Sequence, residues 1–467
     1  MENPHIVIVP SPGFTHLVPI LEFSKRLLHL HHEFRVTCII PSLGPPPPSS
    51  QTYLQSLPPT INFIFLPPIS KDQVPEHAHI TQQIQLGVTH SLPHIHQELK
   101  SLCSRTRVVA LIVDVFANSA LDFARDLKLL SYVYLPLSAM IVSFYFHSKT
   151  LDQVLSSKHM DPQEPIILSG CVPVHYSDLP QACHDLSSDA YKEFLIRSRR
   201  CLSLPDGVLV NSFLELEEET VRVLKEQIRG KPKIFPVGPI IQSASVDHKN
   251  GLECLTWLDK KEPSSVLYVS FGSGGTLSQE QSDELAFGLE LSGVKFLWVV
   301  RAPSNKASAG YFGGAAEESL RFLPLGFVDR TKNQGLVVPF WAPQIQILTH
   351  RSVGGFLCHC GWNSVLESVV KGVPVVAWPL FAEQSLNAVL LTDGLKVALR
   401  PKVNENGIMP REEIAKVVSG LMRSAEGADI RKRMEHLKNA ASKALEEDGS
   451  STMALSELAA DLRGLWH

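Results

Sequence analysis

The chain has 467 residues, which suggests two or three domains of ordinary size rather than one hydrophobic core. Hydrophobic residues make up 44% and charged residues 19%, a globular balance that excludes a disordered, collagenous or fibrous chain. Lys and Arg number 43 against 47 Asp and Glu, a formal net charge of −4, so there is no overall basic field and we expect no nucleic-acid partner.

Cysteine usage and hydropathy bear on where the protein acts. The 8 cysteines form no C-x-x-C pair, and the close pair Cys358 and Cys360 has no second cluster that could complete a zinc site. Such thiols are typical of a reducing compartment. The first apolar stretch, residues 6–9, is too short for a signal peptide, and the longest, residues 132–146, falls short of the ~20 residues of a spanning helix. We therefore expect a cytoplasmic protein without stable membrane insertion, and a monomer.

The first half of the chain alternates short apolar runs with segments of helical spacing. The expected strands are residues 6–10, 35–41, 61–67, 108–116, 208–213 and 234–238. The expected helices are residues 17–30 and about 81–103. Continuous apolar strands separated by helices are typical of a parallel sheet covered on both faces.

A second alternating series follows a polar stretch at about residues 239–250, which is the candidate linker. The expected strands are residues 266–271, 296–301, 337–340, 355–358 and 373–378, with a helix over 278–292. Residues 302–321 are rich in Ser, Gly and Ala and suggest a mobile surface loop, and three amphipathic helices are expected from residue 411. The pattern predicts an α/β fold of two doubly wound domains facing a cleft, with ligands outside the carboxyl ends of the strands.

Two Gly-rich turns each follow an expected strand and precede a helix, at residues 271–278 and 356–367. Such turns present backbone N–H groups and a helix dipole to a phosphate, although a plain tight turn has the same sequence. The first turn fails the dinucleotide pattern G-x-G-x-x-G, because Leu277 stands where the third Gly is needed. The chain has no D-x-D motif, so a metal-held diphosphate is not indicated.

The second turn carries more polar residues than a helix start requires. Ser364 and Glu367 fit the S-x-x-E capping box, which would explain both without a ligand. A cap does not explain why His359, Trp362 and Asn363 crowd the same turn. Two helix N-termini in one domain could therefore hold a diphosphate from two sides.

A histidine and an aspartate follow two expected strands of the first half. His16 comes just after the first strand, although most of the 19 histidines of such a chain are surface or core residues. Asp114 ends the apolar run of residues 111–113, where a carboxylate needs a partner or costs several kcal/mol. Asp114 either caps the next helix or pairs with the His16 imidazole.

Residues 341–384, from Trp341 to Gln384, resemble the signature box of plant family 1 UDP-sugar glycosyltransferases without a gap. The early Pro-Gly-x-x-His-x-x-Pro around His16, the Val-Asp-x-Phe around Asp114 and the Ser-Phe-Gly-Ser ending at Ser273 also match in order. The chain is most similar to the hydroquinone/monolignol (phenolic) glucosyltransferase branch. The resemblance implies a GT-B fold of two Rossmann-like domains. It places an acceptor-binding domain at 1–240, a linker at 241–251, a UDP-sugar-binding domain at 252–448 and a returning helix at 449–467.

The resemblance also implies the donor site. Trp341 would stack on uracil, Gln344 would contact the base region, and Glu367 would accept from the ribose hydroxyls. The resemblance assigns further residues to the diphosphate and the sugar: Ser273, His359, Trp362, Asn363, Ser364, Glu383 and Gln384. Ala342 also belongs to the implied donor site. The donor would be UDP-glucose, bound as a substrate, with no metal and no other cofactor.

The resemblance further implies the reaction. His16 would be the general base that takes the acceptor proton, Asp114 would orient it, and attack opposite UDP would invert the anomeric carbon. The acceptor would be a phenolic small molecule such as a flavonoid, isoflavonoid or phenylpropanoid. Candidate pocket residues are Phe14, Thr15, Phe116, Phe144 and Leu179.

Other functions stay open beside this one. The same transfer could go to a non-phenolic acceptor or to carbon, and a nucleotide-sugar epimerase is a further alternative. A nicotinamide oxidoreductase is disfavoured by the failed dinucleotide pattern, and a non-enzymatic sugar-nucleotide sensor by the presence of both His16 and Asp114. The sequence departs from the common family pattern at Thr15, Cys358 and Glu383, and none of these changes removes a catalytic group.

Overall fold

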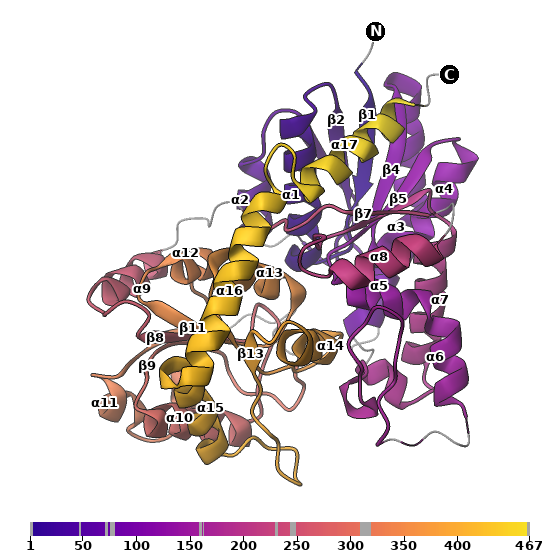
Figure 1. Cartoon of the computed structure of the whole chain (residues 1–467). Coiled ribbons are helices and arrows are strands. Elements are labelled where there is room, and N and C mark those ends of the chain that lie inside the picture. The colour runs from indigo at the N-terminus through magenta and orange to yellow at the C-terminus, as the bar shows by residue number, and fades with distance from the viewer. Residues whose placement is uncertain are drawn as a thin grey trace. The chain divides into compact units, whose positions relative to one another are not determined.

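The structure is a computed structural model that describes residues 3–45, 48–70, 73–74, 80–157, 161, 163–228, 232–242, 249–308 and 319–464. The chain divides into two units, each with one parallel sheet flanked by helices (Figure 1). The N-terminal unit comprises Met1–Pro173, Ala182–Ser243 and Lys443–His467, and the C-terminal unit comprises Val174–Gln181 and Ala244–Ser442. The two doubly wound α/β domains expected from the sequence are confirmed by this pair of sheets.

The sheet of the N-terminal unit has seven strands in the order β3-β2-β1-β4-β5-β6-β7. The strands are β1 (His5–Val9), β2 (Arg35–Ile40), β3 (Ile61–Phe65), β4 (Val108–Asp114), β5 (Leu130–Leu135), β6 (Gly207–Val210) and β7 (Lys233–Pro236). All neighbours are parallel, and the whole of β1 is buried because both faces of the sheet are covered. The chain winds outward in one direction from β1 and in the other from β4, so the topological switch lies between these two strands.

Helices cover this sheet. The described helices are α1 (Phe14–Leu30), α2 (Pro48–Gln55), α3 (Ile80–Arg105), α4 (Leu121–Asp126), α5 (Ala139–Phe146), α6 (Ser148–Leu155), α7 (Asp189–Ser203), α8 (Glu218–Gln227) and α17 (Ser450–Arg463), with short η2 (Val115–Ala120) and η4 (Gln181–His184). The last helix, α17, packs Leu455, Leu458 and Leu462 into the core of this unit, and its Asp461 accepts from Lys233 Nζ at 2.7 Å. Residues far apart in sequence therefore complete one core.

The sheet of the C-terminal unit has six strands in the order β10-β9-β8-β11-β12-β13. The strands are β8 (Val266–Ser270), β9 (Lys295–Val300), β10 (Gly335–Pro339), β11 (Val353–Cys358), β12 (Val375–Ala377) and β13 (Ala398–Leu399). The described helices are α9 (Lys249–Asp259), α10 (Gln279–Ser292), α11 (Phe327–Thr331), α12 (Gln344–Thr349), α13 (Trp362–Lys371), α14 (Gln384–Val389), α15 (Arg411–Arg423) and α16 (Ala425–Ala444), with short η3 (Tyr176–Asp178), η6 (Ser319–Phe322) and η7 (Leu390–Gly394). Here the switch lies between β8 and β11.

Several element limits differ from those expected. The strand expected over 108–116 ends at Asp114, because Asp114 caps η2 by accepting from Phe116 N. The helix expected from residue 17 begins at Phe14, after Gly13 at φ 118°, so His16 lies in the first turn of α1. The apolar residues 132–146 divide at Pro136 into β5 and α5, which sequence periodicity does not separate.

Two expected segments, the surface loop and the linker, lie in part outside the described residues. Residues 309–318 of the expected loop at 302–321 and residues 243–248 of the expected linker lie there. The segment Val174–Gln181 groups with the C-terminal unit, where Arg400 Nη1 donates to Asp178 Oδ1 at 2.7 Å. Nothing in the sequence pattern indicates that this segment, which lies within the N-terminal half of the chain, groups with the C-terminal unit.

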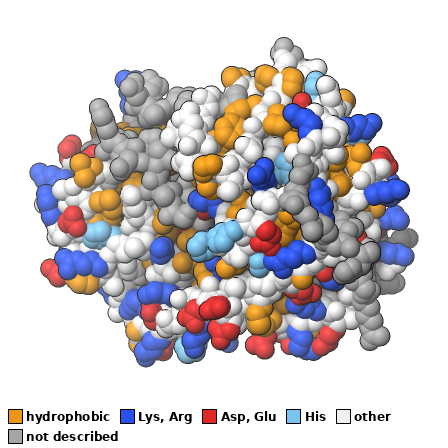
Figure 2. Space-filling view, turned by 90° about the horizontal axis from the view of Figure 1, so that it is seen from above, with side chains coloured by type: hydrophobic (Ala, Val, Ile, Leu, Met, Phe, Trp, Pro, Cys, Tyr) orange, Lys and Arg blue, Asp and Glu red, His pale blue; other side chains and the backbone are white. Residues whose placement is uncertain are grey.

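The surface and the helices of the described residues bear on the expectations about partners. Lys, Arg, Asp and Glu side chains are interspersed over the face that Figure 2 shows. None of the described helices is both long enough and apolar enough to cross a membrane.

A pair of buried tyrosines gives a test of the N-terminal core. The Tyr134 hydroxyl has no hydrogen-bond partner among the described residues, and burial beside Asp114 and Glu22 raises its pKa well above the usual value. The Tyr53 hydroxyl donates to Glu22 Oε1 at 2.8 Å. We expect Tyr134→Phe to leave the free energy of unfolding unchanged or to raise it by up to about 1 kcal/mol, and Tyr53→Phe to lower it by about 1.5 kcal/mol or more.

Thermal unfolding of the two variants compares the same chemical change at both positions. An equal loss of stability in both variants would mean that the Tyr134 hydroxyl is bonded after all, for example through a buried water.

Candidate active site

The switch of the N-terminal sheet brings two predicted residues together. His16 follows β1, Asp114 ends β4, and the two strands are neighbours. His16 Nδ1 lies 3.2 Å from Asp114 Oδ2, and the side chains are 15% and 0% exposed. Since the carboxylate accepts the Nδ1 proton, the neutral ring carries its lone pair on Nε2.

Asp114 is held by more than the imidazole. Its Oδ1 accepts from Ser11 Oγ, and from Phe116 N at 3.2 Å. Both suggested roles of Asp114 therefore apply, since it caps η2 and pairs with His16. Three donors on one carboxylate offset the cost of burying it.

Phe116 and α7 border the pair. The Phe116 ring meets the His16 ring edge to face, with centroids 5.3 Å apart. The Arg197 guanidinium lies 4.9 Å from the centroid of the same Phe116 ring. Arg200, one turn along α7, donates to Asn118 Oδ1 at 3.0 Å, so α7 braces the segment that follows Asp114.

The other candidate pocket residues lie in different environments. Phe14 and Thr15 are half-buried in the first turn of α1, beside His16. Phe144 is buried in α5, and Leu179 is buried in the segment that groups with the C-terminal unit. Only Phe14, Thr15 and Phe116 are placed by the described contacts at the His16 end of the N-terminal sheet.

The switch of the C-terminal sheet brings the two Gly-rich turns together. One follows β8 and the other follows β11, which are neighbours. The His359 ring lies between them, since a methyl group at Gly272 would stand 2.5 Å from His359 Cε1 and one at Gly361 2.5 Å from His359 Nε2. Gly272 also has φ 73°, a conformation that favours glycine. Both glycines are therefore required for this close approach.

His359 is polar, buried and incompletely bonded. Its Nδ1 is enclosed and finds no hydrogen-bond partner within the described ranges, and burial lowers the pKa of the imidazole to about 4. The ring is therefore neutral at physiological pH. An unsatisfied buried nitrogen between two Gly-rich turns is typical of a site that a polar ligand completes.

A hydrogen-bond network joins α12 to α13. Gln344 Nε2 donates to Ser364 Oγ at 2.9 Å and to Glu367 Oε2 at 2.6 Å. The capping-box interpretation is wrong, because α13 begins at Trp362 after Gly361 and no side chain caps it. Ser364 and Glu367 instead face Gln344, and burial raises the pKa of the Glu367 carboxyl to about 7.

The remaining predicted donor residues lie on the segments around these turns. Trp341 and Ala342 connect β10 to α12, Trp362 and Asn363 open α13, and Ser273 is exposed in the turn after β8. Glu383 precedes α14, and the side-chain oxygen of Gln384 accepts from Leu380 N at 2.8 Å.

The sequence interpretation named neither of two residues that lie beside the predicted ones, Ser11 and Arg301. Ser11, which bonds Asp114, lies between two prolines and carries no recognisable motif. Arg301 follows β9 and lines a cavity beside the first Gly-rich turn. Arg301 could have been noticed from its position, because it is a charged residue directly after a buried strand.

Comparison with known proteins gives the family. The pattern described as "UDP-glucoronosyl and UDP-glucosyl transferase" matches residues 240–422. A hydroquinone glucosyltransferase from Rauvolfia serpentina is 49% identical, over 98% of this chain and 97% of its own length. The structure of Phytolacca americana UGT2 complexed with UDP-2fluoro-glucose and pterostilbene is 44% identical with a TM-score of 0.89, covering 98% of this chain and 100% of that one. A Polygonum tinctorium UDP-glucosyltransferase capable of glucosylating indoxyl, in complex with 3,4-dichloroaniline, is 46% identical with a TM-score of 0.90 over 98% of each chain.

The two doubly wound units and the matches to solved UDP-glucosyltransferase structures together assign the chain to the GT-B class of glycosyltransferases. The chain belongs to the UDP-glucuronosyl and UDP-glucosyl transferase family and is a UDP-glycosyltransferase. The expected similarity to the phenolic glucosyltransferase branch is confirmed by the match to the hydroquinone glucosyltransferase.

Proposed function

We propose that the protein is an inverting O-glucosyltransferase that transfers glucose from UDP-glucose to a phenolic small molecule. The acceptor class is a flavonoid, isoflavonoid or phenylpropanoid. The observation that carries the proposal is the His16–Asp114 pair at the switch of the N-terminal sheet. The similarity to a hydroquinone glucosyltransferase and to a structure holding pterostilbene supports the phenolic acceptor.

The chemistry follows from the geometry of the pair. Because Asp114 accepts the Nδ1 proton, His16 Nε2 can take the proton of the acceptor hydroxyl as its oxygen attacks C1 of glucose. A phenol, with a pKa of about 10, is largely protonated at neutral pH and benefits from this base. Asp114 then stabilises the imidazolium that forms. Attack opposite the leaving UDP converts an α-linked donor into a β-glucoside.

The C-terminal unit supplies the donor site in this proposal. Glu367 would accept from the ribose hydroxyls, Trp341 would stack on uracil, and Trp362, Glu383 and Gln384 would contact the sugar. The diphosphate would lie between the N-termini of α10 and α13, where backbone N–H groups and His359 meet the charge that develops on the leaving group. In this proposal these groups take the place of a metal cofactor at the diphosphate.

An acceptor screen tests the proposed function. UDP release from UDP-glucose would be measured with simple phenols, monolignols, flavonols, isoflavones and a terpenoid alcohol, with and without EDTA. We expect release that depends on a phenol, is unchanged by EDTA, and yields a product heavier by one hexose. Release only with the terpenoid alcohol, or a hexose attached to carbon, would contradict the proposed acceptor chemistry. Conversion of the donor sugar without any acceptor would instead indicate an epimerase.

The raised pKa of Glu367 predicts how nucleoside binding depends on pH. Ribose hydroxyls that donate to Glu367 favour the carboxylate, whose pKa in the free protein is about 7. The affinity for uridine is therefore expected to be full above pH 7 and to fall as the pH drops through 7. Burial raises the pKa of Glu367, while the hydrogen bond from Gln344 and the positive charge of Lys371 lower it. His359 stays neutral over this pH range and adds no titration of its own.

Calorimetric titration of uridine between pH 5.5 and 8.5, a range of about 1.5 pH units to each side of that pKa, checks this dependence. Uridine is used because it has no phosphate that titrates in the range. Glu367→Gln is expected to bind weakly and without the pH dependence. A wild-type affinity that does not change with pH would contradict the ribose contact.

A further inference from the structure

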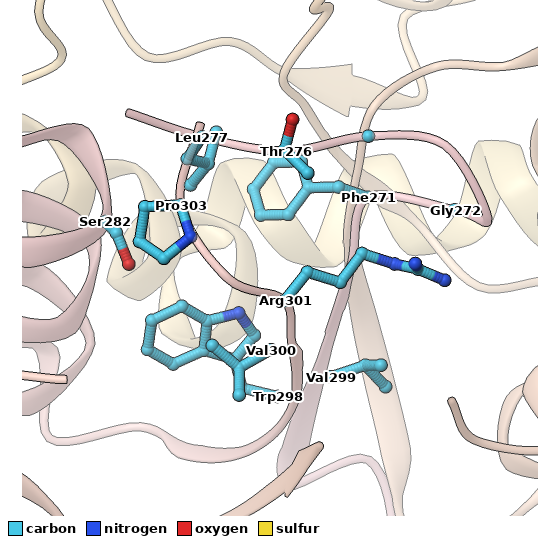
Figure 3. A pocket seen from close by; sticks show the side chains of 11 residues that line it. Phe271, Gly272, Thr276, Leu277, Ser282, Trp298, Val299, Val300, Arg301 and Pro303 are labelled. Carbon is cyan, nitrogen blue, oxygen red and sulfur yellow. The ribbon is translucent and has the colours of Figure 1, made fainter. Parts of the chain in front are cut away.

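A cavity lies beside the first Gly-rich turn of the C-terminal unit (Figure 3). Its described lining residues are Phe271, Gly272, Gly275, Thr276, Leu277, Ser282, Trp298, Val299, Val300, Arg301 and Pro303. One wall is the turn after β8, and the opposite wall is the end of β9. Arg301 is the one charged side chain among these lining residues.

The Arg301 guanidinium has an aromatic neighbour and, in the part of the chain that the structure describes, no acidic one. It lies 4.6 Å from the centroid of the Phe340 ring, a cation–π arrangement. Among the described residues no hydrogen bond or ion pair of this guanidinium is found. By contrast, Arg330, Arg400 and Arg411 of the same unit each pair with a carboxylate.

Arg301 is also removed from solvent to a large extent. Burial lowers the pKa of its guanidinium, although the group stays charged at any physiological pH. A largely desolvated cation without a counter-charge is unfavourable unless a ligand supplies one. In Figure 3 the guanidinium extends from the end of β9 toward the side of the cavity on which Gly272 lies.

The residue under the guanidinium is itself strained. Phe340 has φ 67°, in the left-handed region, which costs a residue with a side chain about 1 kcal/mol or more. Its backbone N–H donates to Val300 O at 2.8 Å, which ties the ring to the strand that precedes Arg301. Strain of this kind is typical of ligand sites.

We propose that Arg301 is a further donor-binding residue, whose guanidinium contacts the diphosphate of the UDP-sugar at the Gly272–Gly275 turn. This inference rests on the proposed donor site. The cavity places the cation and the turn on facing walls, and a diphosphate is the part of the donor that carries the counter-charge. Phe340 holds the guanidinium in place before the donor arrives, which lowers the entropy lost on binding.

Binding measurements with uridine and UDP separate a phosphate contact from a structural role. We expect Arg301→Met to weaken UDP binding by about tenfold or more, because a charge-assisted hydrogen bond is lost, and to leave uridine binding unchanged. Arg301→Lys keeps the charge and is expected to recover part of the UDP affinity. Arg330→Met removes a cation from the same unit, at its exposed pair with Glu290, and is expected to change neither affinity.

The outcomes are distinct. Equal weakening of uridine and UDP by Arg301→Met would show that Arg301 supports the fold of the site and would overturn the proposal, as would unchanged UDP binding. Because these titrations contain no acceptor, a wild-type protein that binds UDP but glucosylates no phenol would overturn the proposed function alone. A wild-type protein that does not bind UDP would overturn the donor site and this inference together.

Discussion

Replacing His16 with alanine is expected to lower kcat by a factor on the order of 10² to 10⁴, the usual contribution of a positioned general base. The imidazole is the group that the Asp114 hydrogen bond orients, with the Nε2 lone pair left for the acceptor proton. The affinity for UDP is expected to stay unchanged, because the proposed donor residues lie in the C-terminal unit. The measurement is steady-state kinetics with a phenol, together with calorimetric titration of UDP.

A matched control lies on the same helix. His29 is exposed near the end of α1, so His29→Ala changes the same residue type without touching the site. We expect this variant to keep the wild-type rate. A His16→Ala enzyme with the wild-type rate would show that the acceptor is deprotonated by another group.

Asp114→Asn is expected to lower kcat by a comparable factor, on the order of 10² to 10⁴, with the fold intact. The reason is geometric. The oxygen that accepts from Phe116 N must stay an oxygen, so the new amide NH₂ faces His16 Nδ1. The ring would then have to accept at Nδ1 and carry its proton on Nε2, which removes the lone pair from the acceptor side.

The measurement is steady-state kinetics of Asp114→Asn, with Asp126→Asn as the control. The two variants make the same chemical change at a buried and at an exposed carboxylate. The second variant, at the exposed end of α4, is expected to be fully active. If Asp114→Asn retained most of the wild-type kcat, the tautomer of His16 would have to be set by a group other than Asp114.

The parts of the fold that sequence reasoning predicts are those with strong local patterns. The fully buried β1 and the long amphipathic α3 lie within a few residues of their expected limits. The apolar run at 132–146 is not resolved by its sequence, because a continuous apolar run fits a strand and a buried helix equally well. Its division into β5 and α5 depends on Pro136 and on the Ser138 cap, whose oxygen accepts from Ile141 N.

The site divides in the same way. His16, Asp114 and the residues of the 341–384 box follow strand ends, and topology alone brings strand ends together. The contacts that complete the site do not depend on local sequence. Ser11 donates a hydrogen bond to a carboxylate 103 positions away in the sequence. Arg301 stands out because its guanidinium has no acidic partner among the described residues. Only tertiary packing shows such features.

The measurement that bears most directly on the central claim is the rate loss of His16→Ala across substituted phenols graded by pKa. A phenol that is already ionised at the assay pH needs no base, whereas one with a pKa of about 10 does. We predict a large loss for the weakly acidic phenols and a loss that shrinks steadily as the acceptor becomes a phenolate. An equal loss for every acceptor would contradict the assignment of His16 as the general base.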